Sequence, residues 1–294
     1  MHKFLRSIGF SEIKRRAEME ELIDEIINEP THRRTITDRD GTIHVEFRRL
    51  YGENFGIAVR GTCEDQETFV PDYFYPYLIG DHVSTMEPVE VEKHSDKESY
   101  AGICDDGKMG VVLIFFLQNA MDFRKRERTY YNALENRATI LTGLSTAGKI
   151  LMSIEPGMLR KTKDERTMRE RNGRIAAAKN GDEAAMESLT LEDIDLYSEL
   201  SERVQKEDLF SIVNTSFMPL GVESDQYSMI GEIVSCKEVR NLRTGEQVCL
   251  MELRCNGMAF DVCINRKDLL GEPMAGRRFR GDVWLQGNTD FANK

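Results

Sequence analysis

The stretch Glu246–Ile264, EQVCLMELRCNGMAFDVCI, contains the strongest secondary-structure signal of this 294-residue chain. Asn256-Gly257 favours a two-residue type I′ turn, because both positions of that turn need a positive φ. The turn therefore predicts a hairpin with strands at Glu246–Cys255 and Met258–Ile264.

Two further strands flank this hairpin, at Met229–Val239 and Phe279–Leu285. A short turn or single helical turn at Asp268–Gly271 lies between them. Four strands with a small helical insert are similar to an OB-fold, which needs a fifth strand. Residues near Phe210–Phe217 can supply that strand or be helical, so we predict a small OB-like β-barrel at residues 227–294.

Four of the six cysteines lie in this C-terminal part, which raises the question of a zinc site. In the predicted hairpin Cys249 and Cys255 share a face but lie about 20 Å apart, at about 3.3 Å per residue. Cys263, opposite Leu250, points to the other face. Three of the four thiols cannot converge within the zinc–sulfur distance of about 2.3 Å. We predict buried free thiols, no metal site and no cofactor.

The N-terminal part, residues 1–156, predicts an α+β domain with a mixed, mostly antiparallel sheet and helices. Ser11 can begin a helix that runs to about Asn28. A hairpin at Thr35–Phe47 has apolar residues facing inward and Thr42, His44 and Glu46 facing outward. The further predicted strands are Val89–Lys93, Tyr100–Cys104 and Gly110–Leu117.

The composition changes after Pro156-Gly157. Residues from Leu159 to about Gln205 are charged, rich in alanine and almost free of aromatic side chains. Such helices are too polar to form a core alone, so we predict a helical connector at residues 157–226 that bridges or braces the flanking sheets.

Gly143–Lys149 matches the G-x-x-x-x-G-K pattern of a phosphate-binding loop. The next residue is Ile150, where that motif has Ser or Thr, and Pro156 leaves about one and a half helical turns at 3.6 residues each. We therefore predict a flexible loop between two strands rather than a nucleotide site.

The net charge of −11 argues against a general nucleic-acid binder, because non-specific affinity for phosphates comes mainly from Lys and Arg. No stretch approaches the roughly 20 apolar residues that span a bilayer. Met1–Phe10 lacks the apolar core of a signal peptide. Without an exported context, six thiols are expected to be reduced. These observations predict a cytoplasmic location and no membrane contact.

Phe69–Tyr77, FVPDYFYPY, is the densest aromatic segment. Its two prolines argue against a central strand, so we expect a loop that folds over the core. Alternatively Tyr73, Tyr75 and Tyr77 form a contact surface for a partner, since tyrosine is enriched in interface hot spots.

Arg278 and Arg280 flank Phe279 in the last predicted strand. Strand alternation places both arginines toward solvent and Phe279 toward the core. The arginines are therefore candidate partner contacts, while stacking of single-stranded nucleic acid on this strand is weakened.

The opening Met1–Phe10, MHKFLRSIGF, and the junction Phe217–Tyr227, FMPLGVESDQY, resemble a bacterial family known only as a domain of unknown function. The resemblance extends over nearly the whole chain. It implies a bacterial, cytoplasmic origin and carries no activity, cofactor or site residue.

No set of nucleophile, base or metal ligands converges in the sequence, so our leading hypothesis is a non-enzymatic binding or scaffold protein with a protein partner or a second copy of itself. The alternative is an enzyme acting on a small polar metabolite in a cleft between the N-terminal sheet and the helices. That alternative predicts a deep pocket with His82 or His94 near a carboxylate or Cys104. A weaker alternative is nucleic-acid binding by the C-terminal barrel.

Overall fold

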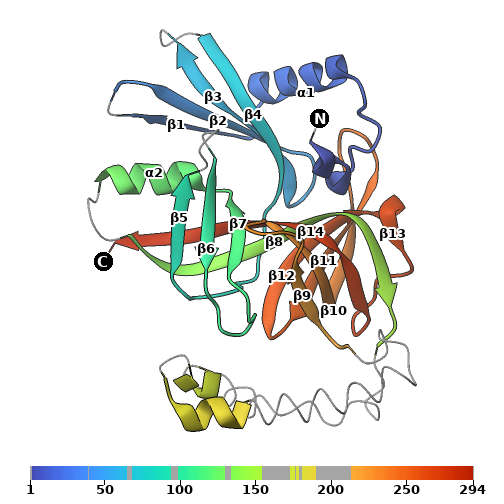
Figure 1. Ribbon diagram of the computed structural model, residues 1–294. Coiled ribbons are helices and arrows are strands. Elements are labelled where there is room, and N and C mark those ends of the chain that lie inside the picture. Colours follow the sequence, from blue (N-terminus) through green and yellow to red (C-terminus); the bar gives the residue numbers. More distant parts are fainter. Residues whose placement is uncertain are drawn as a thin grey trace.

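The computed structural model describes residues 2–38, 40–64, 68–93, 99–129, 134–153, 173–175, 177–178, 181–189 and 213–293. Within these ranges the protein is mostly β with few helices, and its strands form an antiparallel four-stranded sheet and a large mixed sheet (Figure 1). Most of the predicted connector at residues 157–226 lies outside the described residues.

The four-stranded sheet lies beside α1 and has the order β1-β2-β3-β4 (Figure 1). The hairpin predicted at Thr35–Phe47 is confirmed as the β1–β2 pair. The strands are β1 (His32–Thr37), β2 (Ile43–Leu50), β3 (Phe55–Glu64) and β4 (Thr68–Leu78).

The aromatic segment forms β4, so its prediction as a loop is wrong. Pro71 and Pro76 are tolerated because β4 is an edge strand that pairs with β3 and leaves its other side free of ladder hydrogen bonds. The rings of Tyr75 and Tyr77 are each 1% exposed, so this strand contributes to the core.

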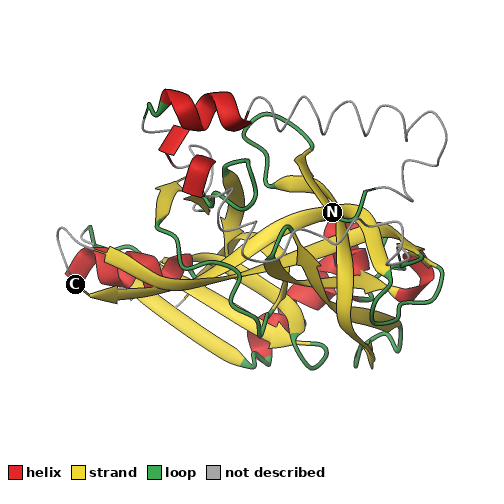
Figure 2. Ribbon diagram, turned by 90° about the horizontal axis from the view of Figure 1, so that it is seen from below, coloured by secondary structure: helices red, strands yellow, loops and turns green. Residues whose placement is uncertain are grey.

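The large mixed sheet has ten strands, in the order β13-β8-β12-β11-β10-β14-β7-β6-β5 with β9 paired to β10. The long strands β8 and β14 run side by side across the molecule (Figures 1 and 2). The strands are β5 (Val89–Lys93), β6 (Tyr100–Cys104), β7 (Leu113–Leu117), β8 (Leu134–Leu151), β9 (Ser216–Pro219), β10 (Gln226–Arg240), β11 (Gln247–Cys255), β12 (Met258–Asn265), β13 (Leu269–Leu270) and β14 (Arg278–Asn293).

Five of these strands are joined in a closed circuit of pairings. β10, β11 and β12 form an antiparallel meander, β12 pairs in parallel with β8, and β14 pairs antiparallel with both β8 and β10. The strand that closes the circuit thus comes from residues 134–151. The division at residues 156 and 226 remains a prediction about folding units, and the pairings of the large sheet cross it.

The central hairpin has the predicted register. Cys249 lies opposite Ile264 and Cys255 lies opposite Met258. Both turn residues adopt positive φ, at 50° for Asn256 and 80° for Gly257, as a type I′ turn requires.

The short helices connect and cover the sheets. Further described residues at 173–175, 177–178 and 183–189 are also helical. The named helices are η1 (Lys3–Ile8), α1 (Arg16–Asn28), α2 (Ala120–Thr129) and η2 (Arg266–Asp268). The helix predicted from Ser11 ends at Asn28 as expected but begins later. The Ser11 hydroxyl instead donates to Glu246 Oε1 at 2.6 Å, which ties the chain start to the C-terminal strands.

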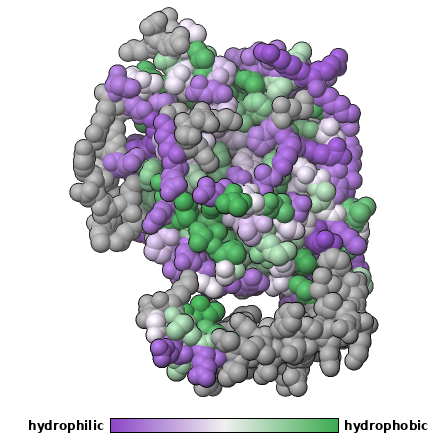
Figure 3. Space-filling model, in the orientation of Figure 1, coloured by the Kyte–Doolittle hydropathy of each residue, from purple (hydrophilic) through white to green (hydrophobic). Residues whose placement is uncertain are grey.

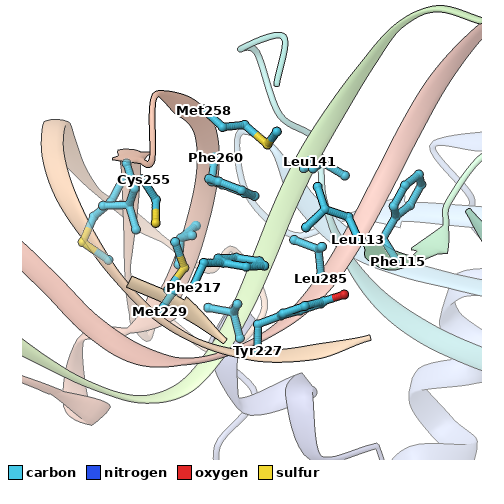
Figure 4. Packing of buried hydrophobic residues seen from close by; sticks show 14 of the residues in the cluster. Leu113, Phe115, Leu141, Phe217, Tyr227, Met229, Cys255, Met258, Phe260 and Leu285 are labelled. Atoms are coloured by element: carbon cyan, nitrogen blue, oxygen red, sulfur yellow. The ribbon is translucent and has the colours of Figure 1, made fainter. Parts of the chain in front are cut away.

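Apolar residues form two buried clusters. One packs among strands of the large sheet, including β7 and β8 (Figure 4), and the other joins η1, α1 and the four-stranded sheet to the large sheet. All six cysteines are free, and Cys249, Cys255 and Cys263 are buried as predicted. Cys236 differs, because its thiol side chain is exposed.

The phosphate-loop-like stretch Gly143–Lys149 lies inside β8, so its prediction as a flexible loop is wrong. Its second glycine has a packing reason. A Cβ on Gly148 would lie 2.4 Å from the Phe279 ring and 3.0 Å from Ile264, so only glycine lets β14 approach β8 this closely.

Gly148→Ala is expected to lower the free energy of unfolding by about 1–3 kcal/mol, because the added methyl overpacks the Phe279 ring. The matched control is Gly107→Ala, whose Cβ would meet nothing within 4 Å. Urea unfolding of both variants measures the difference. Equal stabilities for the two would contradict this packing argument.

Hydrophilic residues dominate the surface around α1, and apolar side chains appear in the middle of the face in Figure 3. Among the exposed apolar residues, Val222 is 95% exposed in the turn after β9, near Met218 and Leu220. No described helix combines the length and apolar character that crossing a bilayer requires.

Candidate functional site

A groove of about 250 Å³ lies where the end of β4 meets the outer face of β10, β11 and β12. Its polar lining includes Asn54, Asp81, His82, Glu252 and Asp261. The residues come from the four-stranded sheet, from the segment that follows it, and from the C-terminal meander. The groove thus lies at the junction of the two sheets.

Asp261 on β12 is the centre of the groove's hydrogen bonds. Its Oδ1 lies 2.8 Å from His82 Nδ1. Its Oδ2 accepts the backbone N–H groups of Asp81 at 2.9 Å and of His82 at 3.1 Å. One carboxylate therefore fixes both the ring and the backbone of His82.

Glu252 on β11 lies on the other side of the same imidazole. Its Oε2 is 3.5 Å from His82 Nε2 and accepts the Ser235 hydroxyl at 3.2 Å. The hydrogen bond to Asp261, together with the charges of Asp261 and Glu252, raises the pKa of His82 above its ordinary value, against a smaller effect of burial. The arrangement favours an imidazolium whose two N–H groups both face carboxylates.

The local sequence explains how His82 reaches this position. A Cβ on Gly80 would lie 2.6 Å from the Ile140 side chain and 2.7 Å from Asp261 Oδ2, so glycine allows the backbone to pass close to β8 and β12. Beyond His82, the Ser84 hydroxyl donates to Ala259 O at 2.6 Å. The chain is therefore held against the C-terminal strands on both sides of the histidine.

Asp261→Asn is expected to lower the pKa of His82, because it removes the partner that contributes most to the shift. Histidine-resolved NMR titration measures the change. Asp290→Asn, at an exposed position of β14, serves as the matched control and should leave the titration of His82 unchanged. A His82 pKa that stays the same in Asp261→Asn would contradict the geometry.

The other chemical candidates do not join this groove. Cys104 is buried on β6 and is not part of the groove lining; burial raises the pKa of its thiol to about 11. His94 lies outside the described residues. Of the pocket that the enzyme hypothesis predicts, the structure contains His82 close to carboxylates, but beside β10–β12 rather than beside helices.

The predicted partner contacts are spread over different surroundings. Tyr75, Tyr77 and Arg278 are buried, Tyr73 is partly buried and Arg280 is exposed. The prediction of Arg278 toward solvent is wrong. Its guanidinium donates to the carbonyl oxygens of Met152 and Val213.

Phe279 is fully buried, as predicted. Partner contact stays a prediction, and solvent reaches Arg280 and, in part, Tyr73.

A second polar cluster, around Glu46 on β2, was missed by sequence reasoning. Glu46 was predicted to face outward, but it is fully buried. Its carboxylate accepts Arg48 Nε at 2.6 Å and also accepts Arg60 Nε and, at 3.0 Å, the Tyr75 hydroxyl. Both arginines also donate to the carbonyl oxygen of Gln118, just before α2.

The Glu46 cluster joins the four-stranded sheet to the large sheet. The Gln118 side-chain amide donates to Leu78 O at 2.9 Å and to Gln286 Oε1 of β14 at 2.8 Å. Burial alone would raise the pKa of Glu46, but the charges of Arg60 and Arg48 lower it to about 2. The donors and acceptors satisfy one another, so we assign this cluster a structural role.

In the described part of the chain, no three or more His, Cys, Asp or Glu side chains are grouped to hold a metal ion. A family model described as "Domain of unknown function, E. rectale Gene description (DUF3881)" matches residues 5–287. No curated protein and no solved structure matches the chain.

Proposed function

The chain belongs to the family described as domain of unknown function DUF3881, and on that premise we propose that it is a non-enzymatic binding or scaffold protein whose groove at His82 takes a small polar ligand. One observation carries the proposal: Asp261 and Glu252, from two strands of the large sheet, converge on His82 in a groove of about 250 Å³. Concave sites with a few convergent polar groups are the usual places for small ligands.

The hydrogen bonds of the groove favour binding over catalysis. Each ring nitrogen of His82 faces a carboxylate, so neither is free to act as a base. The Ser235 hydroxyl donates to Glu252 rather than to the imidazole. A nucleophile–base pair of the kind that acyl transfer uses is therefore not assembled among these side chains.

The charge of the groove indicates the class of ligand. Three carboxylates, of Asp81, Glu252 and Asp261, line it beside His82 and Lys237, and Lys237 is paired with Glu53 at 2.8 Å. Carboxylates accept hydrogen bonds and repel anions. The proposed ligand is therefore a small molecule with hydroxyl or amino donors.

The test is isothermal titration with putrescine, a diamine, and with glycerol and inorganic phosphate. We expect binding of a donor-bearing probe, no binding of phosphate, and a loss of about tenfold or more in affinity in Glu252→Gln, since hydrogen bonds to charged groups contribute about 1.5–3 kcal/mol. Asp290→Asn is the matched control. Binding of phosphate but of neither donor-bearing probe would contradict the proposal.

An enzyme acting on a small polar metabolite is the second candidate, favoured by the Asp261-held imidazolium in an open groove, which can act as a general acid. Its test is NMR observation of a metabolite mixture with wild-type protein and with His82→Gln. Consumption of a metabolite that requires His82 would favour the enzyme.

Nucleic-acid binding by the C-terminal strands is a weaker candidate, supported by the exposed Arg280. It predicts salt-dependent retention of an oligonucleotide. Unchanged retention after charge reversal of the exposed Arg280 would count against it.

We also propose that the closed circuit of β8, β10, β11, β12 and β14 is an OB-type barrel in permuted chain order. The support is its five strands and the helical turn η2 between β12 and β14. In this proposal the fifth strand is β8 rather than residues near Phe210–Phe217.

The predicted cytoplasmic location and the predicted protein partner or second copy remain proposals. Six free thiols support the location, since disulfides are rare in reducing compartments. The exposed Val222 turn supports a partner.

A further inference from the structure

Residues Gly80–Val83 run along the groove between two fixed points, and Asp81 and His82 line it. We call this segment the strap. Before it, Ile79 N donates to Asn54 O at 2.6 Å. After it, Ser84 N donates to Thr139 O at 2.9 Å and the Ser84 hydroxyl accepts Leu141 N, also at 2.9 Å. The ends of the strap are therefore held by hydrogen bonds between uncharged backbone and hydroxyl groups, whose strength does not change with pH.

The middle of the strap is held in a different way. Asp261 accepts hydrogen bonds from the backbone N–H groups of Asp81 and His82 and lies against the His82 ring. Asn54 Nδ2 donates to Asp81 Oδ2 at 3.0 Å. Val83 is 52% exposed, so apolar packing contributes little at this end. Polar contacts to Asp261 of β12 and Glu252 of β11 are thus the main attachment of the middle of the strap.

The charged groups that face His82 are Asp261 from β12, Glu252 from β11 and Asp81 from the strap itself. Lys237 of β10 lines the same groove but is paired with Glu53. A protonated His82 places one positive charge among three carboxylates. A neutral imidazole can donate through one ring nitrogen only. If Nδ1 of His82 donates to Asp261, the lone pair of Nε2 faces the Glu252 carboxylate.

We propose that the strap is a pH-sensitive latch, in which protonated His82 ties Gly80–Val83 to both β12 and β11 and deprotonation releases the attachment to β11. The latch regulates access to the groove, and that consequence rests on the proposed function. The movement itself needs no ligand.

The pH range follows from the pKa of His82, which the hydrogen bond to Asp261 raises above the ordinary 6.5. For a group whose pKa is raised on folding, the stabilisation is fully present below the unfolded value and is lost as the pH rises through the folded value. The strap is therefore attached to both β12 and β11 at acidic pH, and its attachment to β11 is lost on the alkaline side of pH 6.5.

The experiment is amide hydrogen exchange of the strap in the ligand-free protein from about pH 5 to about pH 9, corrected for the intrinsic exchange rate, with His82 titrated by NMR on the same samples. We expect the protection of the strap amides from hydrogen exchange to fall by about 2- to 5-fold as His82 deprotonates. A change of this size corresponds to the loss of a partly exposed ion pair. Protection that does not change with pH after the correction would overturn the latch.

Three variants separate the latch from a general effect of pH. His82→Gln should show no pH-dependent step in strap protection. Glu252→Gln should show a smaller step at lower pH, because it removes the charge on β11 that holds the imidazolium and raises the His82 pKa. His44→Gln, which alters a histidine paired with Asp38 on β2, is the matched control and should keep the wild-type step. A step that persists in His82→Gln contradicts the proposal.

Putrescine titrations at both ends of the pH range distinguish this inference from the proposed function. A pH step in exchange without any binding of the probes leaves the latch intact and contradicts the binding role. Binding of a probe without a pH step in exchange supports the binding role and contradicts the latch.

Discussion

Replacing Glu46 by alanine is expected to lower the free energy of unfolding by about 3–5 kcal/mol, because removing one partner of a buried ion cluster leaves the others unpaired. Arg48 and Arg60 would each lose a charge-assisted hydrogen bond in a place that water does not reach. Urea unfolding measures the loss. The matched control is Glu20→Ala, whose carboxylate pairs with Arg16 on the surface of α1 and should contribute less than about 1 kcal/mol.

The same carboxylate gives a pH dependence that can be checked independently. Its pKa is lowered on folding to about 2, so its contribution is present above the ordinary value of 4.5 and is lost as the pH falls toward 2. In Glu46→Ala this part of the acid destabilisation should be missing. A variant as stable as the Glu20→Ala control would show that the cluster does not hold the two sheets together.

Replacing Phe260 by alanine is expected to cost about 3–5 kcal/mol, the range for truncating a buried phenylalanine. The ring is 1% exposed on β12 and stacks on Phe217 of β9, with centroids 5.3 Å apart (Figure 4). The truncation removes a contact between two strands that are distant in sequence and leaves a cavity in the C-terminal core.

A double-mutant cycle with Phe217→Ala tests this contact by urea unfolding. Residues in contact show an interaction energy of about 0.5–3 kcal/mol, whereas independent ones add. Strict additivity of the two truncations would mean that β9 does not pack on β12 as described.

The C-terminal hairpin could be predicted to the residue. Asn256-Gly257 fixes the turn type, and a two-residue turn fixes every cross-strand pair, so the opposition of Cys249 to Ile264 follows from local chemistry. The same register showed that the thiols do not converge. Local signals also gave the β1–β2 hairpin and the end of α1 at Asn28.

What the sequence did not reveal depends on contacts between distant segments. Alternation along β2 placed Glu46 correctly on the face opposite Val45, but a single strand cannot show that this face is covered by residues near Gln118. In the same way, the prolines of Phe69–Tyr77 did not show that β4 lies at a sheet edge, where proline is tolerated.

The candidate site was found in part. His82 was named as a possible catalytic residue near a carboxylate or Cys104. The carboxylate itself was not identified, because Asp261 lies 179 positions away and has the pattern of an ordinary outward strand residue. Gly80, which permits the close approach of the strap, was the one local signal near it. The sequence also did not identify β8 as the strand that closes the circuit, because its partners β12 and β14 lie far along the chain.

The binding groove at His82 is tested by mapping backbone amide chemical shifts by NMR while putrescine or glycerol is added to the wild-type protein and to Glu252→Gln. We expect chemical-shift changes around Asp81–His82, Cys236, Glu252 and Asp261 in the wild-type protein, and their loss in the variant. Shifts that lie elsewhere on the molecule, or that survive Glu252→Gln unchanged, would contradict a binding groove at His82.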